Sequence, residues 1–297
     1  QRLFITGGTG FFGIWLLESF AHANRVLGLN AEVVVLSRNP AAFLAKLPHL
    51  ASEPCLKFIE GDVRDFTFPD GRFSHVIHAA TEASAKLNDE APHQMLDAIV
   101  GGTQRVLRFA AQAGVQKLLL TSSGAVYGRQ PSELTHLSEE YIGAPDPLVP
   151  GSAYGEGKRV AEHLCAVHGL QHGCEVKIAR CFAFLGPHLP LATHFAVGNF
   201  IRDAMRGGPI QVIGDGMPYR SYLYAADLAV WLWTILFRGQ SGRAYNVGSP
   251  EATRIVDLAS AVSSTLGVNE GIMVAAGVTS GIGSSRYVPD VQRAEVE

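Results

Sequence analysis

The chain lacks several features that would place it in other classes of protein. Its 297 residues contain no apolar run that reaches the roughly 18 residues of a membrane-spanning helix. The formal net charge is only −3, so no positive excess indicates nucleic acid or an anionic membrane as a partner. There is no internal repeat and no low-complexity tract. We therefore expect a globular, cytoplasmic protein that binds neither a membrane nor nucleic acid.

Cysteine is also scarce, and its spacing does not indicate a metal site. The four cysteines are Cys55, Cys165, Cys174 and Cys181. They form no Cys-x2-Cys pair, and a cytosolic enzyme keeps its thiols reduced, so we expect no disulfide. One segment gathers possible ligands, namely His163, Cys165, His168, His172 and Cys174. Because zinc needs four convergent ligands and this segment spans a helix end and a glycine-containing turn, we predict no metal.

What the chain does contain is a glycine loop at its start. An apolar run over residues 2–5 predicts a buried strand, and the apolar spacing over residues 11–20 predicts a helix. Between and after them, Gly7, Gly10 and Gly13 fit the G-x-x-G-x-x-G pattern. Such glycines allow a tight turn, a close approach to a pyrophosphate, and close packing of helix on strand. The loop therefore predicts a dinucleotide site at the start of the helix, although similar loops also occur as plain turns.

Further predicted strands end in residues that suit a dinucleotide. These strands cover residues 32–36, 56–59, 74–78 and 117–121. Their carboxyl ends carry, in order, Ser37-Arg38 beside the ribose, Asp62-Val63 at the adenine edge, His78-Ala79-Ala80, and Ser122-Ser123. Ligands bind at the carboxyl ends of strands in open α/β sheets, so these positions agree with a single site. The alternation of strands and helices up to about residue 179 predicts an α/β fold with a doubly wound parallel Rossmann sheet.

Three residues form a candidate proton-transfer set. Tyr154 and Lys158 are four positions apart on a predicted helix and so lie on one face. An ammonium group beside a phenol favours the phenolate and lowers its pKa from about 10. Ser123 follows the fifth strand, where its hydroxyl can hold a substrate oxygen. A lone Tyr-x3-Lys pair is more often an exposed helix face. Together with the glycine loop, however, it indicates hydride transfer at a carbon that bears oxygen.

The chain resembles the extended short-chain dehydrogenases/reductases of the nucleotide-sugar epimerase/dehydratase family over nearly its whole length. The resemblance rests on residues 6–13, 61–62, 78–80, 122–128, 154–158, 180–187, 219–227 and 245–248. It implies an NAD(P) cofactor and a nucleoside-diphosphate sugar as substrate. It also implies that Arg220 meets the diphosphate and that residues 209–214 run beside the base. A homodimer is implied too, with the helices over residues 91–113 and 153–168 packed against their copies, although the apolar stripes of these helices are equally compatible with an ordinary core.

The candidate site residues fall into three sets. The catalytic set is Ser123, Tyr154 and Lys158. The cofactor-binding set is Gly7, Gly10, Phe11, Phe12, Gly13, Ser37, Arg38, Asp62, Val63, His78, Ala79, Ala80, Ser122, Tyr154, Lys158, Cys181 and Phe182. The substrate-binding set is Thr81, Ser123, Ala183, His194, Asn199, Val212 and Arg220.

The chain departs from the family pattern at three places. The Asp-Glu pair of the 4,6-dehydratases is replaced by Gly124 and Ala125, so elimination of water lacks its acid and base. The second strand ends without the Asp typical of NAD enzymes, and Arg38 suits a 2′-phosphate, which slightly favours NADP over NAD. The Asn expected after the sixth strand is Ala183. Residues 192–195 are candidates for different contacts through His194, although His194 is equally compatible with an ordinary surface histidine.

The chain changes character after Arg180. We expect a dinucleotide-binding domain over residues 1–180 and a substrate-binding part over residues 181–297, with residues 222–248 returning to the main domain. In the second part we predict a helix over residues 194–206, a strand over residues 210–213 and a mobile loop over residues 274–285. The start at Gln1 and the missing closing helix after Glu297 lead us to expect trimmed ends.

Three functions are compatible with these residues. The leading interpretation is an enzyme that oxidises the C4 hydroxyl of a nucleotide sugar and returns hydride to the other face, giving an epimer. Arg38 supports the alternative, a one-way NADPH-dependent reductase of a 4-keto sugar. A third class, a dinucleotide-binding regulator without turnover, is disfavoured because Ser123, Tyr154 and Lys158 are intact.

Overall fold

The computed structural model describes residues 1–81, 85–192, 195–268, 270–275 and 285–297. Its centre is a seven-stranded sheet with the order β11-β6-β5-β4-β1-β2-β3, in which every neighbouring pair is parallel. The strands are β1 (Arg2–Thr6), β2 (Glu32–Ser37), β3 (Leu56–Glu60), β4 (His75–His78), β5 (Lys117–Ser123), β6 (Glu175–Cys181) and β11 (Arg243–Val247). The predicted Rossmann sheet is therefore confirmed.

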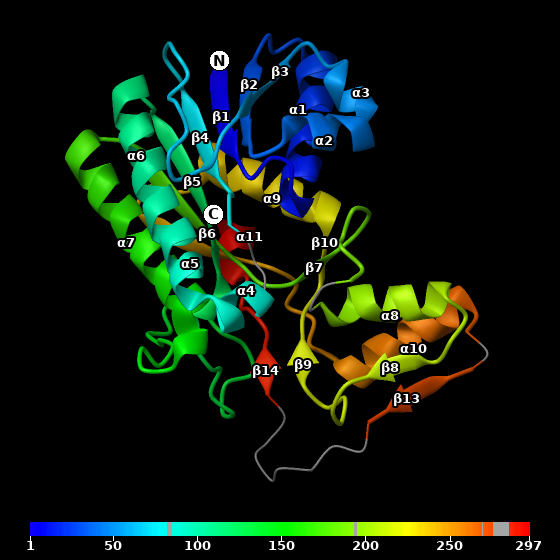
Figure 1. The fold of residues 1–297 in the computed structure, drawn as a ribbon. Helices are drawn as coiled ribbons and strands as arrows, with labels where there is room; N and C mark the ends of the chain where they lie inside the picture. Colours follow the sequence, from blue (N-terminus) through cyan, green and yellow to red (C-terminus); the bar gives the residue numbers. More distant parts are fainter. Residues whose placement is uncertain (82–84, 193–194, 269, 276–284) are drawn as a thin grey trace.

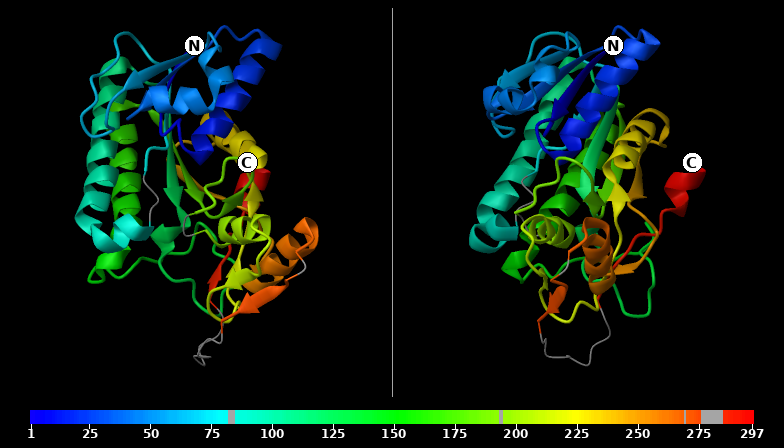
Figure 2. Two further views of the ribbon diagram at one scale, coloured as in Figure 1. Left: turned by 45° about the vertical axis from the view of Figure 1, so that its right-hand side comes forward. Right: turned by 90° about the vertical axis from the view of Figure 1, so that its right-hand side faces the viewer.

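Helices cover both faces of this sheet (Figures 1 and 2). One face carries α1 (Phe11–Leu27), α2 (Pro40–Lys46), α3 (Pro48–Ala51) and α9 (Ala225–Arg238). The other carries α5 (Pro92–Leu96), a π-helical turn (Asp97–Gly101), α6 (Gly102–Ala113) and α7 (Ala153–His172), with α4 (Ala85–Glu90) before them. Successive side chains along each strand point to opposite faces of the sheet. Each face therefore packs against its helices in an apolar core of its own.

The main differences from the predicted elements lie at their ends. The first helix was expected to stop at Phe20 but continues to Leu27, where Gly28 takes a left-handed φ of 59° and closes it. The fifth strand extends through Ser123, because Ser122 and Ser123 still pair with β6. The helix expected over residues 91–113 is interrupted by the π turn. The helix expected from residue 194 is α8 (Ala196–Met205), which begins after Phe195.

A smaller part lies below the carboxyl ends of the strands in Figure 1. In it, α8 and α10 (Ile255–Leu266) pack beside the parallel pair β8 (Ile210–Val212) and β13 (Ile272–Val274). The helix α10 is absent from the sequence-based predictions, although Leu258 and Ala259 are buried in the core of this part. The expected loop over residues 274–285 lies almost wholly outside the described residues.

Short strands connect the smaller part to the sheet. They are β7 (Phe184–Leu185) paired with β10 (Leu223–Tyr224), and β9 (Tyr219–Arg220) between β12 (Thr253–Arg254) and β14 (Arg286–Tyr287). The strand β11 and the helix α9 belong to the large sheet and its covering layer. None of the described helices is long and apolar enough to cross a membrane.

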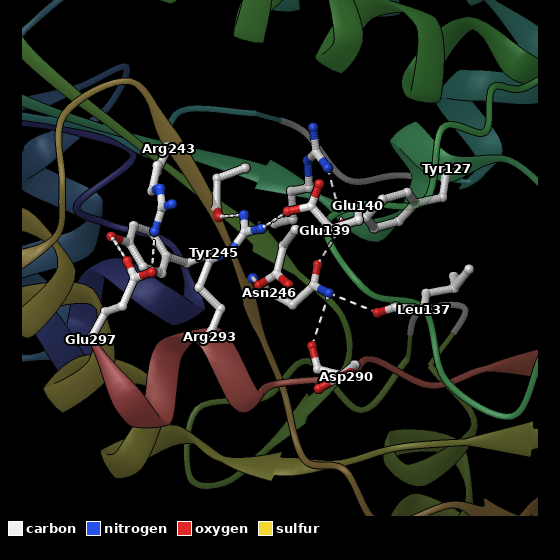
Figure 3. Close-up of polar contacts among 12 residues, drawn as sticks. Tyr127, Leu137, Glu139, Glu140, Arg243, Tyr245, Asn246, Asp290, Arg293 and Glu297 are labelled. Atoms are coloured by element: carbon white, nitrogen blue, oxygen red, sulfur yellow. Dashed lines mark hydrogen bonds and ion pairs between the residues drawn. The ribbon is translucent and has the colours of Figure 1, made fainter.

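Residues 285–297, which we call the C-terminal strap, carry β14 and α11 (Gln292–Val296) back to the main sheet. Figure 3 shows the buried Asn246 of β11 at the centre of this attachment. Its side-chain amide donates to the carbonyl oxygens of Leu137 (2.8 Å) and Asp290 (2.9 Å), and its oxygen accepts from the hydroxyl of Tyr127 (2.8 Å). Arg293 pairs with Glu140 nearby. The strap is thereby fixed to the loop after β5, which matters for the site below.

Candidate active site

A cavity of about 1650 Å³ runs along the carboxyl ends of the strands, between the sheet and the smaller part. Single drug-sized ligands occupy pockets of roughly 300–1,000 Å³. The cavity is therefore large enough for two ligands side by side. The glycine loop lines one end of it and residues of α8, β8 and β9 line the other.

The glycine loop is shaped to bring backbone close to a bound group. Gly7 has a left-handed φ of 73°, and a Cβ at that position would lie 2.5 Å from the carbonyl carbon of Ala79. A Cβ on Gly13 would lie 2.3 Å from the carbonyl carbon of Gly8. The helix α1 begins after Gly10 without a side-chain cap, so its first N–H groups are open to a phosphate. The loop thus fits the pyrophosphate of a dinucleotide.

The adenosine end of the cavity is lined by Ser37, Arg38, Asp62 and Val63. Asp62 accepts a hydrogen bond of 2.8 Å from the Arg64 Nε atom. Hydrogen bonding from Arg64 lowers the pKa of Asp62, and the charge of Arg38 acts in the same direction. Asp62 is therefore ionised at neutral pH, with Arg38 close enough to influence it. The residue after β2 is a cation, whereas an NAD site commonly has an acid there.

The predicted catalytic residues lie together where β5 meets α7. The Lys158 ammonium donates to the hydroxyl of Thr81 (2.7 Å) and to the carbonyl oxygen of Thr121 (2.8 Å). Burial lowers the pKa of Lys158 to about 8. Burial also raises the pKa of Tyr154 to about 12, and the influence of the Ser123 hydroxyl opposes that shift. Lys158 Nζ is 5.9 Å from the centre of the Tyr154 ring. In this state Tyr154 is a weak acid, and it needs further positive charge nearby to act as a base.

The helix α7 is held in register by polar contacts at both ends of its catalytic turn. The backbone N–H of Tyr154 donates to Asn88 Oδ1 at 2.9 Å. Two turns further on, Glu162 accepts from the Ser122 hydroxyl (2.6 Å) and pairs with Arg180 (2.7 Å). Ser122 lines the cavity, but its hydroxyl is committed to Glu162. These contacts tie the helix to β5 and β6.

Most predicted cofactor residues line the cavity, but Gly13 and His78 do not. Gly13 lies behind the glycine loop, where it permits the close contact described above. His78 is buried between the hydroxyls of Thr6 (2.8 Å) and Thr103 (3.1 Å). Burial lowers its pKa to about 3, so the ring is neutral at physiological pH. These two residues shape the site from behind instead of facing a cofactor.

At the substrate end, Thr81, Ala183, Asn199 and Arg220 line the cavity. Arg220 donates to the carbonyl oxygen of Tyr219 at 2.7 Å, and burial lowers its pKa. Within the part of the chain that the structure describes, no carboxylate pairs with Arg220. A guanidinium in this setting is available to a bound anion.

Two predicted substrate residues stand apart from that set. Val212 is buried in the core of the smaller part, 2% exposed, while its neighbours Gln211 and Ile213 face the cavity. Successive side chains along β8 point to opposite faces, and the prediction chose the residue on the face away from the cavity. His194 lies outside the described residues.

Sequence reasoning also missed residues that line the cavity. The clearest are Asn88, Tyr222 and Tyr287. Tyr287 belongs to the C-terminal strap, 129 positions after Lys158, the last residue of the catalytic set. Only the tertiary structure brings it near that set. Among the described residues, no three His, Cys, Asp or Glu side chains are arranged to hold a metal ion.

A parallel Rossmann sheet with a glycine loop and a Ser-Tyr-Lys corner is the architecture of the short-chain dehydrogenases/reductases. A model of the NAD-dependent epimerase/dehydratase family matches residues 3–248, most of the chain. The chain therefore belongs to this family, as its resemblance implied.

Named relatives show the range of activities within it. UDP-glucuronic acid decarboxylase 6 of Arabidopsis thaliana is 32% identical over 263 residues, which cover 88% of this chain and 73% of that protein. A dTDP-glucose 4,6-dehydratase of Streptomyces venezuelae, solved with NAD bound, is similar with a TM-score of 0.84 and 25% identity, covering 100% of this chain and 90% of that one. A UDP-glucose 4-epimerase of Thermus thermophilus, also solved with NAD, has a TM-score of 0.80 and 26% identity, covering 99% and 92%.

Proposed function

We propose that this chain oxidises the C4 hydroxyl of a nucleoside-diphosphate sugar with a nicotinamide dinucleotide and returns the hydride to the opposite face, so that it acts as a C4 epimerase. One observation carries the proposal. Ser123, Tyr154 and Lys158 share one corner of a cavity whose far wall is the glycine loop. The two ends of a single cavity thus suit a hydride carrier and an alcohol.

The chain's own residues would manage the proton in this reaction. A bound dinucleotide would supply the hydride acceptor and donor. Ser123 would hold the sugar oxygen, and Tyr154 would take its proton as hydride leaves C4. Lys158 is positioned to support the phenolate, since its ammonium is 5.9 Å from the Tyr154 ring. Return of the hydride to the opposite face of C4, together with the proton from Tyr154, would complete the cycle with no net change in redox state.

The substrate class rests on Arg220 and on the relatives. Arg220 is a half-buried guanidinium on the cavity wall, which suits a diphosphate. The relatives named above act on UDP- or dTDP-linked sugars by their names. We propose that residues 181–297, except the returning residues 222–248, provide this substrate-binding part.

A one-way reduction of a 4-keto sugar by NADPH is the second candidate. Its supporting observation is Arg38 on the cavity wall after β2, where a 2′-phosphate would meet a cation. The bound NAD in the two similar structures supports the other cofactor. We propose that this chain binds NADP(H) more tightly than NAD(H). Cofactor affinities, together with product analysis, distinguish the epimerase from the reductase.

The decisive experiment separates cofactor use from chemistry. The purified protein is first denatured, and the released nucleotides are identified by mass spectrometry. UDP-glucose, dTDP-glucose and UDP-glucuronic acid are then each incubated with the protein and NAD⁺ or NADP⁺. An epimer keeps the mass of its substrate, whereas decarboxylation lowers it by one CO₂. If no sugar is changed and none raises the melting temperature while a dinucleotide does, the regulator without turnover becomes the better account.

We also propose that the protein is a homodimer through α5, α6 and α7. Val160 and Leu170 on α7 are 41% and 88% exposed, which leaves apolar side chains accessible on one of the expected helices. Light scattering after size exclusion tests this. Val160→Lys combined with Leu170→Lys should shift the mass from dimer to monomer, whereas a monomeric wild type would contradict the proposal.

A further inference from the structure

Three hydroxyl groups meet at the catalytic corner, and sequence reasoning accounts for only two of them. Ser123, Tyr154 and Tyr287 all line the cavity, and the Ser123 hydroxyl acts to lower the pKa of both phenols. Its Oγ atom also accepts from the backbone N–H of Ala125 at 3.1 Å. A serine hydroxyl has one proton and two acceptor lone pairs. Because Ala125 takes one lone pair, Ser123 can donate to only one of the two tyrosines, and a bond to the other requires that tyrosine to donate.

The absence of a side chain at position 124 makes room for the third hydroxyl. A Cβ on Gly124 would lie 2.6 Å from Tyr287 Oη and 2.8 Å from the Phe182 ring. The Tyr287 hydroxyl therefore occupies the space that a side chain at position 124 would need. The 4,6-dehydratases carry an acidic side chain in this loop. In this chain, Gly124 replaces it and the Tyr287 hydroxyl occupies the space.

The C-terminal strap holds Tyr287 in place. The N–H of Leu137 donates to the carbonyl oxygen of Val288 (2.9 Å), and the N–H of Val288 donates to Gln130 Oε1 (3.0 Å). Three residues after Tyr287 along the strap, the carbonyl oxygen of Asp290 accepts a hydrogen bond from the Asn246 side chain, as Figure 3 shows. The Tyr287 ring lies 4.6 Å from that of Phe182, centre to centre. A side chain held on both sides in this way keeps its hydroxyl beside Gly124, the residue after Ser123.

We propose that Tyr287 is a positioning residue that donates its hydroxyl proton to Ser123 Oγ and so directs the single Ser123 proton toward Tyr154 and the substrate oxygen beside it. Tyr287 exchanges no atom with the substrate and keeps its own proton. Its effect is to stabilise negative charge on Tyr154 through Ser123, since hydrogen bonds in a chain strengthen one another in a buried site. This inference rests on the proposed role of Tyr154 as the base.

The charges around the two phenols agree with these directions. Lys158 faces the corner from α7, Cys181 from β6, and Arg220 from β9 beside Tyr287. Burial raises the pKa of Tyr287, so it keeps its proton at neutral pH and remains a donor. Lys158 acts on the same corner as a cation, whereas burial raises the pKa of the Cys181 thiol to about 12, so that it is neutral. Tyr154, whose ring centre lies 5.9 Å from the Lys158 ammonium, is the phenol that we assign as the base.

The test measures the ionisation of Tyr154 directly. The protein is produced with 3,5-difluorotyrosine, whose more acidic phenol ionises in a milder pH range, and is titrated by fluorine NMR with and without saturating NAD⁺. The eight tyrosine signals are assigned from single Tyr→Phe variants. Tyr287→Phe should raise the pKa of Tyr154 by about 0.5–1 unit. The ring and its packing on Phe182 remain, so the fold should be kept, as a melting curve can verify.

Two further variants make the result specific. Tyr141→Phe removes a hydroxyl outside the cavity and should leave the Tyr154 titration unchanged. In a Ser123→Ala background, adding Tyr287→Phe should produce no further rise, because the connecting hydroxyl is gone. An unchanged Tyr154 pKa in Tyr287→Phe, or an equal rise in the Ser123→Ala background, contradicts the proposal. So does a Tyr154 that stays protonated up to the unfolding pH in every variant.

The titration without NAD⁺ separates this inference from the proposed function. If the protein fails to turn over any sugar, the dependence of Tyr154 on Tyr287 should still be present in the free protein. If it does turn over a sugar, the pH dependence of kcat should shift upward with the NMR value, whereas a purely structural loss would lower kcat equally at all pH values.

Discussion

The two ends of the cavity are built in different ways. The cofactor end consists of loops that directly follow β1, β2, β3 and β4, neighbours in one sheet, and it presents mainly backbone and small side chains. The substrate end is assembled from α8, β8, β9 and the C-terminal strap, which are far apart in the chain, and it presents larger side chains such as Arg220 and Tyr287. A dinucleotide site built on backbone changes little with sequence, whereas a site built on side chains can change its chemistry by single substitutions.

The largest effect expected from this difference is a missing reaction. We predict that the protein does not catalyse 4,6-dehydration of dTDP-glucose. Gly124 and Ala125 supply no acid or base, and such groups contribute about 10²–10⁴-fold each. Among the described residues that line the cavity, the carboxylates are Asp62 and Asp203, and each is paired with an arginine.

The measurement is incubation with dTDP-glucose, followed by a search for the 4-keto-6-deoxy product by its alkaline absorbance and a mass loss of one water. Production of this compound over many turnovers would overturn the prediction. Glu82, which lies outside the described residues, would then be the first residue to replace.

The second prediction concerns the corner where the two ends meet. Tyr154→Phe should lower turnover by about 10²–10⁴-fold, because the phenol proton is lost while the ring stays. Dinucleotide affinity should remain within about twofold of wild type, because the glycine loop is untouched. Steady-state kinetics and calorimetry measure the two quantities, and Tyr141→Phe is the matched control. Retention of at least half of the activity in Tyr154→Phe would remove Tyr154 from the mechanism.

The third prediction is a pH dependence of stability. Burial lowers the pKa of Lys158 from 10.5 to about 8, so the unfolded chain holds more protons than the folded one between these values. Below pH 8 the buried lysine is charged and lowers the free energy of unfolding by its full cost. This cost disappears as the pH rises toward 10.5. The free energy of unfolding of wild type minus that of Lys158→Met should therefore rise by about 3 kcal/mol across this window. Urea unfolding at both ends of the window measures the difference, and a flat or falling value contradicts it.

The same contrast explains what the sequence could predict. The parallel sheet and the glycine loop follow from local patterns, because each strand end and its ligand residues are adjacent in sequence, and the sheet and the family are confirmed. Val212 was placed on the wrong side, although the alternation of Ile210, Gln211 and Val212 buries the two apolar side chains and leaves Gln211 at the cavity. Tyr287 could not be anticipated, because its approach to Ser123 depends on the strap and on the space beside Gly124. The roles of the individual site residues stay predictions.

The fourth prediction tests whether the substrate end depends on a single cation. Arg220→Ala should weaken binding of the nucleotide sugar by about 10–100-fold, the value of a charge-assisted hydrogen bond to phosphate. Arg220→Lys should recover only part of this, because an ammonium lacks the two-pronged geometry of a guanidinium. Cofactor affinity should not change. Calorimetry with UDP-glucose and dTDP-glucose measures the effect, and Arg206→Ala, at the exposed arginine that directly follows α8 and lies outside the cavity wall, is the control. Equal losses in both alanine variants would show that Arg220 has no special role.

The smallest expected effect lies at the cofactor end, at a position where that end presents a charged side chain. Arg38 follows β2 on the cavity wall and contributes to the low pKa of Asp62. If it meets a 2′-phosphate, wild type should bind NADP(H) more than about tenfold more tightly than NAD(H), since the contact is worth roughly 1.5–3 kcal/mol. Arg38→Ala should abolish the preference, and Arg38→Asp should reverse it, because a carboxylate repels the phosphate and can accept from the ribose hydroxyls of NAD(H). Calorimetric titration of the three proteins with both cofactors decides the question. Equal or tighter binding of NAD(H) by wild type would assign Arg38 a different role and bring the cofactor end into line with the NAD-bound relatives.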